Sequence, residues 1–204
     1  MSKKVFYVEE RAVRITNKND IAAINFVALA TATPTFDDRP TEYIYVRSKR
    51  VIGIDNHRIH CATLEDGLLE GGLYRLAKST KKECILERIK DEVSYPSQSI
   101  IDKYMQQVNG RKVEVKEKIL KFLPAILVYL VGGNGQAIKP EYLIDVCRFL
   151  PSANVIVTLP SDPTHGVHIL HTSENMEAFI MPIVYKLCGA SHSLNSSKIV
   201  ERKY

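Results

Sequence analysis

The first third of the chain alternates between apolar and polar residues in a readable order. Residues 4–15 alternate loosely, which predicts a strand, and apolar side chains recur at helical spacing from Ile21 to Ala28. Asn19 or Asp20 is expected to cap that helix. Three short strands separated by polar residues are predicted next, at 43–46, 51–54 and 58–62. This part of the chain therefore has a strand, a helix and then three strands.

The last third has a similar pattern. Pro140 fits the first turn of a helix. One face of that helix carries apolar residues at Leu143, Val146, Cys147 and Leu150, and Pro151 ends it. Three strands are predicted after it, at 155–159, 167–171 and 178–184.

The middle of the chain is harder to interpret. A hairpin is predicted from strands at 73–77 and 83–89, joined across the turn-prone residues 78–80. A short helix over 95–105 and a turn at Asn109-Gly110 follow. Residues 116–131 are typical of a helix interrupted or kinked at Pro124, and the glycine-rich residues 132–135 are expected to form a loop.

The composition is that of a globular protein with one domain or two small ones. The chain has 204 residues, of which 45% are hydrophobic and 25% charged, and a formal net charge of +5. The apolar run from Phe122 to Gly133 is shorter than the roughly 20 residues that a membrane-spanning helix needs, so we expect buried core and no membrane segment. The first residues do not resemble a secretory signal, which favours a cytoplasmic location.

No motif in the sequence predicts an enzyme or a cofactor. The four cysteines form no C-x-x-C pair and are expected to be small buried side chains. The sequence contains no G-x-S-x-G elbow and no phosphate-binding G-x-x-x-x-G-K-[ST] loop. We therefore expect a protein that binds partners rather than one that catalyses a reaction.

Two stretches resemble the bacterial DNA polymerase sliding clamp, the DNA polymerase III beta subunit. Ile138 to Leu150 (IKPEYLIDVCRFL), followed by NVIVTL, SDPTHGVHI and FIMPI, matches the end of that family in order and spacing. Asp37-Asp38-Arg39 and Asp55-Asn56-His57-Arg58-Ile59 are similar to its D-x-R segment and its Asp-Gly-His-Arg-Leu strand start. A weaker similarity covers residues 83–102, where an extended run leads into Tyr95-Pro96.

The resemblance implies an α+β, DNA-clamp-like fold, in which helices pack on one face of antiparallel curved sheets. A clamp protomer resembles three consecutive copies of a β-α-β-β-β-α-β-β-β unit, and this chain is too short for three. We therefore expect residues 1–188 to form one unit with an insertion at about 65–136, because the opening and closing segments complete one copy. The alternative is two abbreviated units, residues 1–110 and 111–188. Residues 189–204 are expected to be a basic flexible tail.

The resemblance also implies a sliding-clamp-like replication accessory protein that binds duplex DNA without reading its sequence. Such clamps form closed rings of six units, so one unit per chain requires six copies and two units require three. The candidate DNA contacts are Lys18, Arg39, Lys139 and Arg148, although the first predicted helix has few basic residues. Solvated surface charge explains these residues equally well.

Clamps also capture short peptides of polymerases and repair proteins in an apolar pocket. Matching residues give His57, Arg58, Ile59, Met181 and Pro182 as the pocket, with Asn56 where the family has glycine. For Ile59 and Met181, plain core packing is the competing interpretation.

Two other functions remain open. One is a non-enzymatic peptide-binding adaptor that keeps the clamp fold but does not encircle DNA. The other is a metal protein or hydrolase built on the grouped side chains His57, His60 and Cys61, on His165, His168 and His171, or on Asp37, Asp38 and His57. The surrounding residues favour a strand at 167–171, on which His165 and His168 face opposite ways.

Overall fold

A computed structural model describes residues 8–31, 43–55, 57–89, 110–115, 123–136, 138–149, 155–162, 164–171 and 176–182. The first seven elements in chain order are β1 (Val8–Ile15), α1 (Lys18–Ala28), β2 (Ile44–Arg47), β3 (Arg50–Ile54), β4 (Arg58–Thr63), β5 (Gly72–Ser79) and β6 (Cys84–Ile89). They are followed by β7 (Gly110–Val115), α3 (Leu123–Gly133), α4 (Pro140–Cys147), β8 (Val155–Pro160), β9 (Val167–His171) and β10 (Met176–Ile180).

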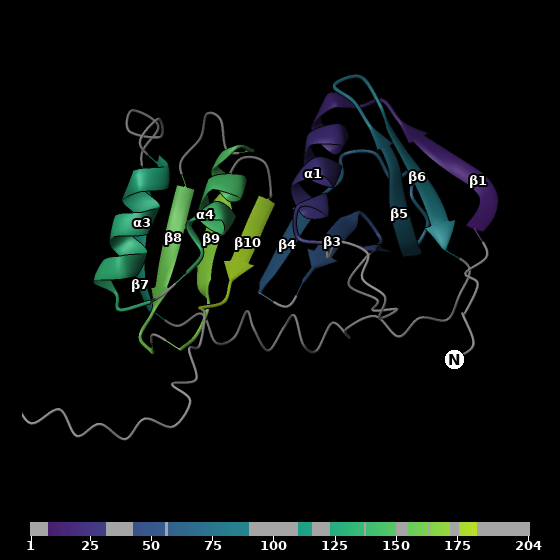
Figure 1. The fold of residues 1–204 in the computed structure, drawn as a ribbon. Coiled ribbons are helices and arrows are strands. Elements are labelled where there is room, and N and C mark those ends of the chain that lie inside the picture. The colour runs from purple at the N-terminus through teal and green to yellow at the C-terminus, as the bar shows by residue number, and fades with distance from the viewer. Residues whose placement is uncertain are drawn as a thin grey trace, which may run out of the picture.

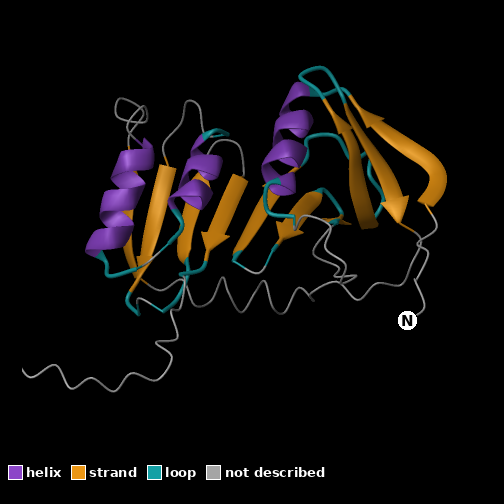
Figure 2. Ribbon diagram, in the orientation of Figure 1, coloured by secondary structure: helices purple, strands orange, loops and turns teal. Residues whose placement is uncertain are grey.

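The ten described strands form one sheet in the order β1-β6-β5-β2-β3-β4-β10-β9-β8-β7 (Figure 1). Every neighbouring pair is antiparallel. The described helices α1, α3 and α4 lie along one face of this sheet (Figure 2). The prediction of an α+β fold with helices on one face of antiparallel sheets is therefore confirmed.

The strand order is nearly symmetric about the β4–β10 pair. Going outward from that pair, β4, β3 and β2 lie on one side, and β10, β9 and β8 lie on the other. On the second side β7 pairs directly with β8, whereas on the first side the β5–β6 hairpin separates β1 from β2. The first side is thus built from a strand, a helix, three strands and an added hairpin, and the second side from a strand, two helices and three strands.

The main hydrophobic core lies between the sheet and the helices. Its fully buried side chains include Ile24 and Phe26 from α1, Leu143 from α4, and inward-facing strand residues such as Val157 and Ala178. Outer strands such as β2, β8 and β9 contribute alternate residues to this core, as strands packed on one face should. Burial of this apolar area is the dominant stabilising term for the fold.

A second buried cluster lies on the opposite face of the sheet. It consists of Ile52, Ile54, Ile59, Cys61 and Phe179 from the central strands β3, β4 and β10. Ile59 and Phe179 are direct cross-strand partners. The centre of the sheet is therefore apolar on both faces.

Helix α1 approaches the sheet closely at Gly53 of β3. A Cβ atom at this position would lie 2.2 Å from the backbone carbonyl oxygen of Val27. Real Cβ atoms do not come that near to a backbone oxygen, so only glycine allows this spacing between helix and strand.

The predicted cap of α1 was wrong by two or three residues. Asn17 caps the helix, because its Oδ1 accepts hydrogen bonds from the backbone N–H groups of Asn19 and Asp20 at 2.8 and 3.2 Å. Asp20 is buried, and its carboxylate instead accepts the N–H groups of Glu65 and Asp66. This residue fixes the loop after β4 rather than the start of the helix.

The middle of the chain differs most from the sequence interpretation. Gly110 begins strand β7, where a turn was predicted, and it pairs with Pro160. A Cβ at Gly110 would lie 1.8 Å from the Leu159 carbonyl oxygen, so this glycine allows close strand contact. Pro124 lies in the first turn of α3, a position that its missing N–H favours, and the part of the predicted helix at 116–122 lies outside the described residues. The helix also includes Gly132 and Gly133, which were expected in a loop.

The remaining differences are small or lie outside the described residues. Strand β5 runs to Ser79, so the hairpin turn lies at residues 80–83 instead of 78–80. Strand β10 ends at Ile180, before Met181 and Pro182. The expected helix at 95–105 and the expected tail at 189–204 fall outside the described residues. Residues 65–136 contribute β5, β6, β7 and α3, while the division of the chain into units stays a prediction.

Candidate functional site

Arg58, the first residue of β4, links the two sides of the sheet. Its Nε donates to Oδ2 of Asp55 and its Nη1 to Oδ2 of Asp145 on α4, both at 2.9 Å. The Arg58 side chain is only 11% exposed, and its guanidinium lies 4.4 Å from the ring centroid of Tyr142. Two carboxylates and one aromatic face therefore share a single cation.

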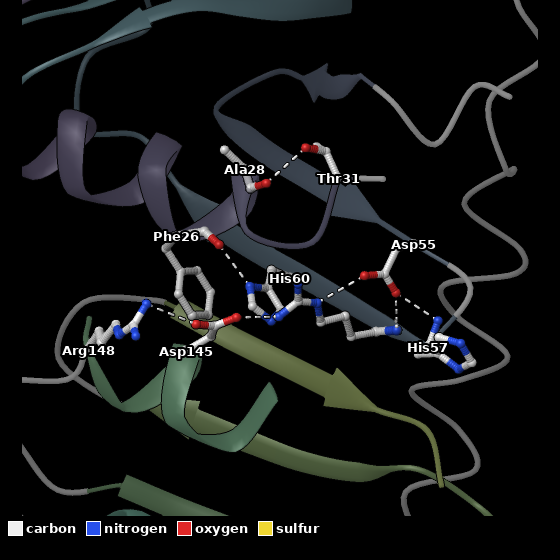
Figure 3. Close-up of polar contacts among 9 residues, drawn as sticks. Phe26, Ala28, Thr31, Asp55, His57, His60, Asp145 and Arg148 are labelled. Carbon is white, nitrogen blue, oxygen red and sulfur yellow. Dashed lines mark hydrogen bonds and ion pairs between the residues drawn. The ribbon is translucent and has the colours of Figure 1, made fainter. Parts of the chain in front are cut away.

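The turn before β4 is shaped by Asp55. Its Oδ1 accepts the backbone N–H groups of His57 and Arg58 at 2.7 and 2.8 Å (Figure 3). This side-chain turn leaves the His57 carbonyl oxygen facing β10, where it accepts the N–H of Met181 at 2.7 Å. A backbone hydrogen bond thus joins the start of β4 to the end of β10.

His60 lies beneath α1, between the two sides of the sheet. It is fully buried, stacks on Phe26 with ring centroids 4.5 Å apart, and its Nδ1 lies 2.7 Å from the Phe26 carbonyl oxygen (Figure 3). Burial lowers the pKa of His60 to about 4. The ring is therefore neutral at pH 7, and Nδ1 carries the proton that it donates to Phe26.

The structure brings only some of the predicted pocket residues together. His57 and Met181 meet through their backbones, and both side chains are half-buried, as is Pro182. Arg58 is already held by its two carboxylates on the helix side. Ile59 packs on the other face of the sheet, because successive strand residues point in opposite directions.

The predicted DNA contacts are scattered. Lys18 begins α1 and Lys139 precedes α4, and both are exposed. The Lys139 ammonium lies 5.5 Å from the Tyr142 ring centroid. Arg148 follows α4, is 66% exposed and pairs with Asp145. Arg39 lies outside the described residues.

Sequence reasoning missed the partners that organise this site. Asp145 and Tyr142 are separated from Arg58 by more than eighty positions, so no local pattern links them. Asp55 was noticed only as part of a motif. An Asp side chain that accepts a hydrogen bond from the backbone N–H two residues later is nevertheless a common turn, and Asp is a known signal for it.

The histidines considered as metal ligands have other contacts. His57 stacks near Tyr142, and His168 stacks on Phe179 and lies 3.2 Å from a carboxylate oxygen of Glu177. His171 points to the face of the sheet opposite that of His168. Within the described ranges, no three His, Cys, Asp or Glu side chains gather as a metal site would need. Asp37 and Asp38 lie outside those ranges.

None of the described helices has the length and apolar character that crossing a membrane requires.

Solved structures of bacterial clamps match this arrangement. The DNA polymerase III subunit beta of Pseudomonas aeruginosa superposes with a TM-score of 0.57 and 12% sequence identity, covering 90% of this chain and 70% of that one. The beta subunit of Thermotoga maritima gives a TM-score of 0.54, and the beta sliding clamp of Caulobacter crescentus gives 0.57. Both superpositions cover 90% of this chain and 67% of the chain of the matched clamp.

The chain has the sliding-clamp fold. At 11–12% identity the likeness extends to the fold and not to a shared activity. No protein-family model matches the sequence, and no curated protein matches it. The sequence resemblance and the superposition nevertheless agree on one architecture, with helices on one face of a continuous antiparallel sheet.

Proposed function

We propose that this protein is a sliding-clamp subunit of two abbreviated units, and that three copies close into a ring around duplex DNA. The observation that carries the proposal is the ten-stranded antiparallel sheet with its helices on one face, which matches a clamp over 90% of this chain.

The two-unit version rests on the share of the clamp that is matched. A clamp protomer resembles three copies of one unit, and the superposition covers 67–70% of it, close to two copies. The near-symmetry about β4 and β10 supports the same division. A ring of six units then needs three chains, joined between the β7 edge of one sheet and the β1 edge of the next.

The charges on the helix side predict loose contact with DNA. Helix α3 carries no charged residue, and Arg148 is paired with Asp145. Within the described residues, Lys18 and Lys139 are exposed cations at the starts of α1 and α4. With few phosphate contacts, binding to open DNA falls off at modest salt, and retention depends on ring closure.

Partner proteins are proposed to dock by short peptides at the end of β10. His57, Met181 and Pro182 are half-buried there and offer apolar contact beside a backbone turn. Polymerase or repair proteins tethered in this way would move with the ring along the duplex.

The test combines mass and topology. Sedimentation equilibrium should give three times the 23.1 kDa chain mass at high protein concentration. Protein concentrated together with a nicked circular plasmid should then co-elute with it in gel filtration at about 0.5 M salt, and should be lost once the plasmid is cut. If the protein is lost equally from circular and cut DNA, and its mass is that of a monomer, the ring proposal is wrong.

Among the residues that the structure describes, cations on the helix side are few, and this favours a second function, a peptide-binding adaptor that keeps the clamp fold without encircling DNA. A monomer that binds no plasmid but retains a clamp-binding peptide of a polymerase would support this alternative. The peptide arm of the experiment therefore separates the two functions.

A further inference from the structure

A groove runs along the exposed side of α1, away from the β4–β10 turn. Its volume is about 620 Å³, which falls in the range of about 300–1,000 Å³ typical of ligand sites. It lies between the helix, the β5–β6 turn and the segment that follows α4, and Figure 1 shows that turn beside α1. The lining residues are Lys18, Ile21, Ala22, Asn25, Ala28, Leu29, Ser79, Thr80, Lys81 and Phe149.

The floor of the groove is apolar and its rim is cationic. Ile21, Ala22, Leu29 and other apolar side chains form the floor, and no Asp or Glu is among the lining residues. Lys18 and Lys81 are both exposed, and neither has an ion-pair partner within the described part of the chain. The groove therefore offers apolar contact and positive charge with no carboxylate to balance it.

Hydrogen bonds fix the polar side chains so that donors remain available. Ser79 Oγ donates to Asn25 Oδ1 at 2.6 Å, which orients the Asn25 amide. Its Nδ2 has no hydrogen-bond partner among the residues described here, whereas Thr80 Oγ1 is used by the N–H groups of Lys82 and Glu83. The unused polar groups are thus donors, which suit a carboxylate.

We infer that this groove binds a partner segment in which an apolar side chain lies next to a carboxylate. The apolar floor supplies the anchor, and Lys18 and Lys81 pair with the acidic group. Nucleic acid is a poorer fit, because phosphates gain nothing from an apolar floor. The inference goes beyond the proposed ring and requires neither DNA nor ring closure.

The experiment uses the full chain labelled with nitrogen-15 and two amidated probes, Ac-Glu-Leu-Phe-Leu-Glu and Ac-Lys-Leu-Phe-Leu-Lys. The acidic probe should shift amide resonances of α1 and the β5–β6 turn, and the basic probe should not. The double variant Lys18→Glu with Lys81→Glu should lose about tenfold in affinity for the acidic probe and gain affinity for the basic one. This reversal is a result that mere loss of folding does not produce.

Matched controls test charge and floor separately. Lys82 is exposed next to Lys81 but does not line the groove, so Lys82→Glu should leave acidic-probe affinity within about twofold of the parent. Ala22→Leu places a larger side chain in the groove while keeping the helix, so it should weaken binding of the acidic probe.

Three results would overturn the inference. One is no shift at about 5 mM acidic probe. Another is a set of shifts confined to the β4–β10 turn and insensitive to charge reversal at Lys18 and Lys81. The third is protection of the groove by duplex DNA with no probe binding, which would assign the two lysines to phosphates and favour the ring. Failure of the ring test by itself leaves the groove proposal standing, whereas the third result removes the groove proposal and supports the ring, so the two failures can be told apart.

Discussion

Arg58 of β4 and Asp145 of α4 form an ion pair with 2.9 Å between Nη1 and Oδ2, across the junction of the two sides of the sheet. The two side chains are 11% and 19% exposed, so water screens this pair poorly. Asp145 also receives Arg148, whose side chain is 66% exposed. The Asp145 carboxylate thus pairs with one largely buried arginine and one exposed arginine. Removing each arginine in turn compares the contributions of a buried and an exposed ion pair to stability.

The Arg58→Ala variant should lose about 3 kcal/mol of unfolding free energy, because Asp55 and Asp145 are left partly buried without their cation. The Arg148→Ala variant should lose about 0.5 kcal/mol or less, because its pair is exposed. Urea denaturation measures both. Similar losses for the two arginines would contradict the assignment of Arg58 as the link between the two sides.

Replacement of Gly53 by alanine should destabilise the protein by about 2–3 kcal/mol, because the new Cβ meets the Val27 carbonyl and forces α1 off the sheet. Gly132 in α3 has nothing within 4 Å of such a Cβ, so Gly132→Ala should be neutral or stabilise by up to about 1 kcal/mol. Thermal unfolding followed by circular dichroism compares the pair. A stable Gly53→Ala protein would show that the helix can move away from β3 at little cost.

Stability should fall as the pH is lowered from about 6.5 to about 4, partly because of His60. Burial holds its folded pKa near 4, below the ordinary 6.5, so the unfolded chain binds a proton that the folded chain excludes. The contribution is present above pH 6.5, is lost progressively down to pH 4, and amounts to about 3 kcal/mol over the full window.

The His60→Asn variant isolates this contribution, since the amide can still donate to the Phe26 carbonyl but does not titrate in this range. Urea unfolding at pH 7 and pH 4.5 should show a smaller pH dependence in the variant than in the parent. Parallel pH profiles would mean that other groups carry the acid sensitivity.

The described cysteines should be unreactive in the folded protein. Burial raises the pKa of Cys61 and of Cys147 to about 12, and it also raises the pKa of Cys84, so thiolate is scarce at pH 8. In a Cys188→Ser background, Ellman's reagent should label these thiols at the rate of global unfolding, and rapidly in urea. Fast labelling of Cys147 in buffer would show that α4 opens locally.

Local pattern was sufficient for most elements. The strands β2, β3, β4, β8 and β9 lie within two residues of their predicted bounds, because alternation depends only on near neighbours. Helix α4 begins at the predicted Pro140 but ends at Cys147, three residues before the predicted Leu150. The pattern failed at β7, where Gly110 looked like a turn signal. Glycine there allows close backbone approach, and only the paired strand β8 reveals that use.

The sequence by itself determined the strand and helix types, the α+β class and the clamp resemblance, since each rests on short segments of chain. Only the tertiary structure decided that Arg58 forms ion pairs with Asp55 and Asp145. It also decided that Asp20 accepts hydrogen bonds from the loop after β4 instead of capping α1, and that α1 and the β5–β6 turn line a groove. Apart from the local Asp55–Arg58 pair, these contacts join residues tens of positions apart. They depend on which strands pair at the centre of the sheet, and no local periodicity encodes that choice.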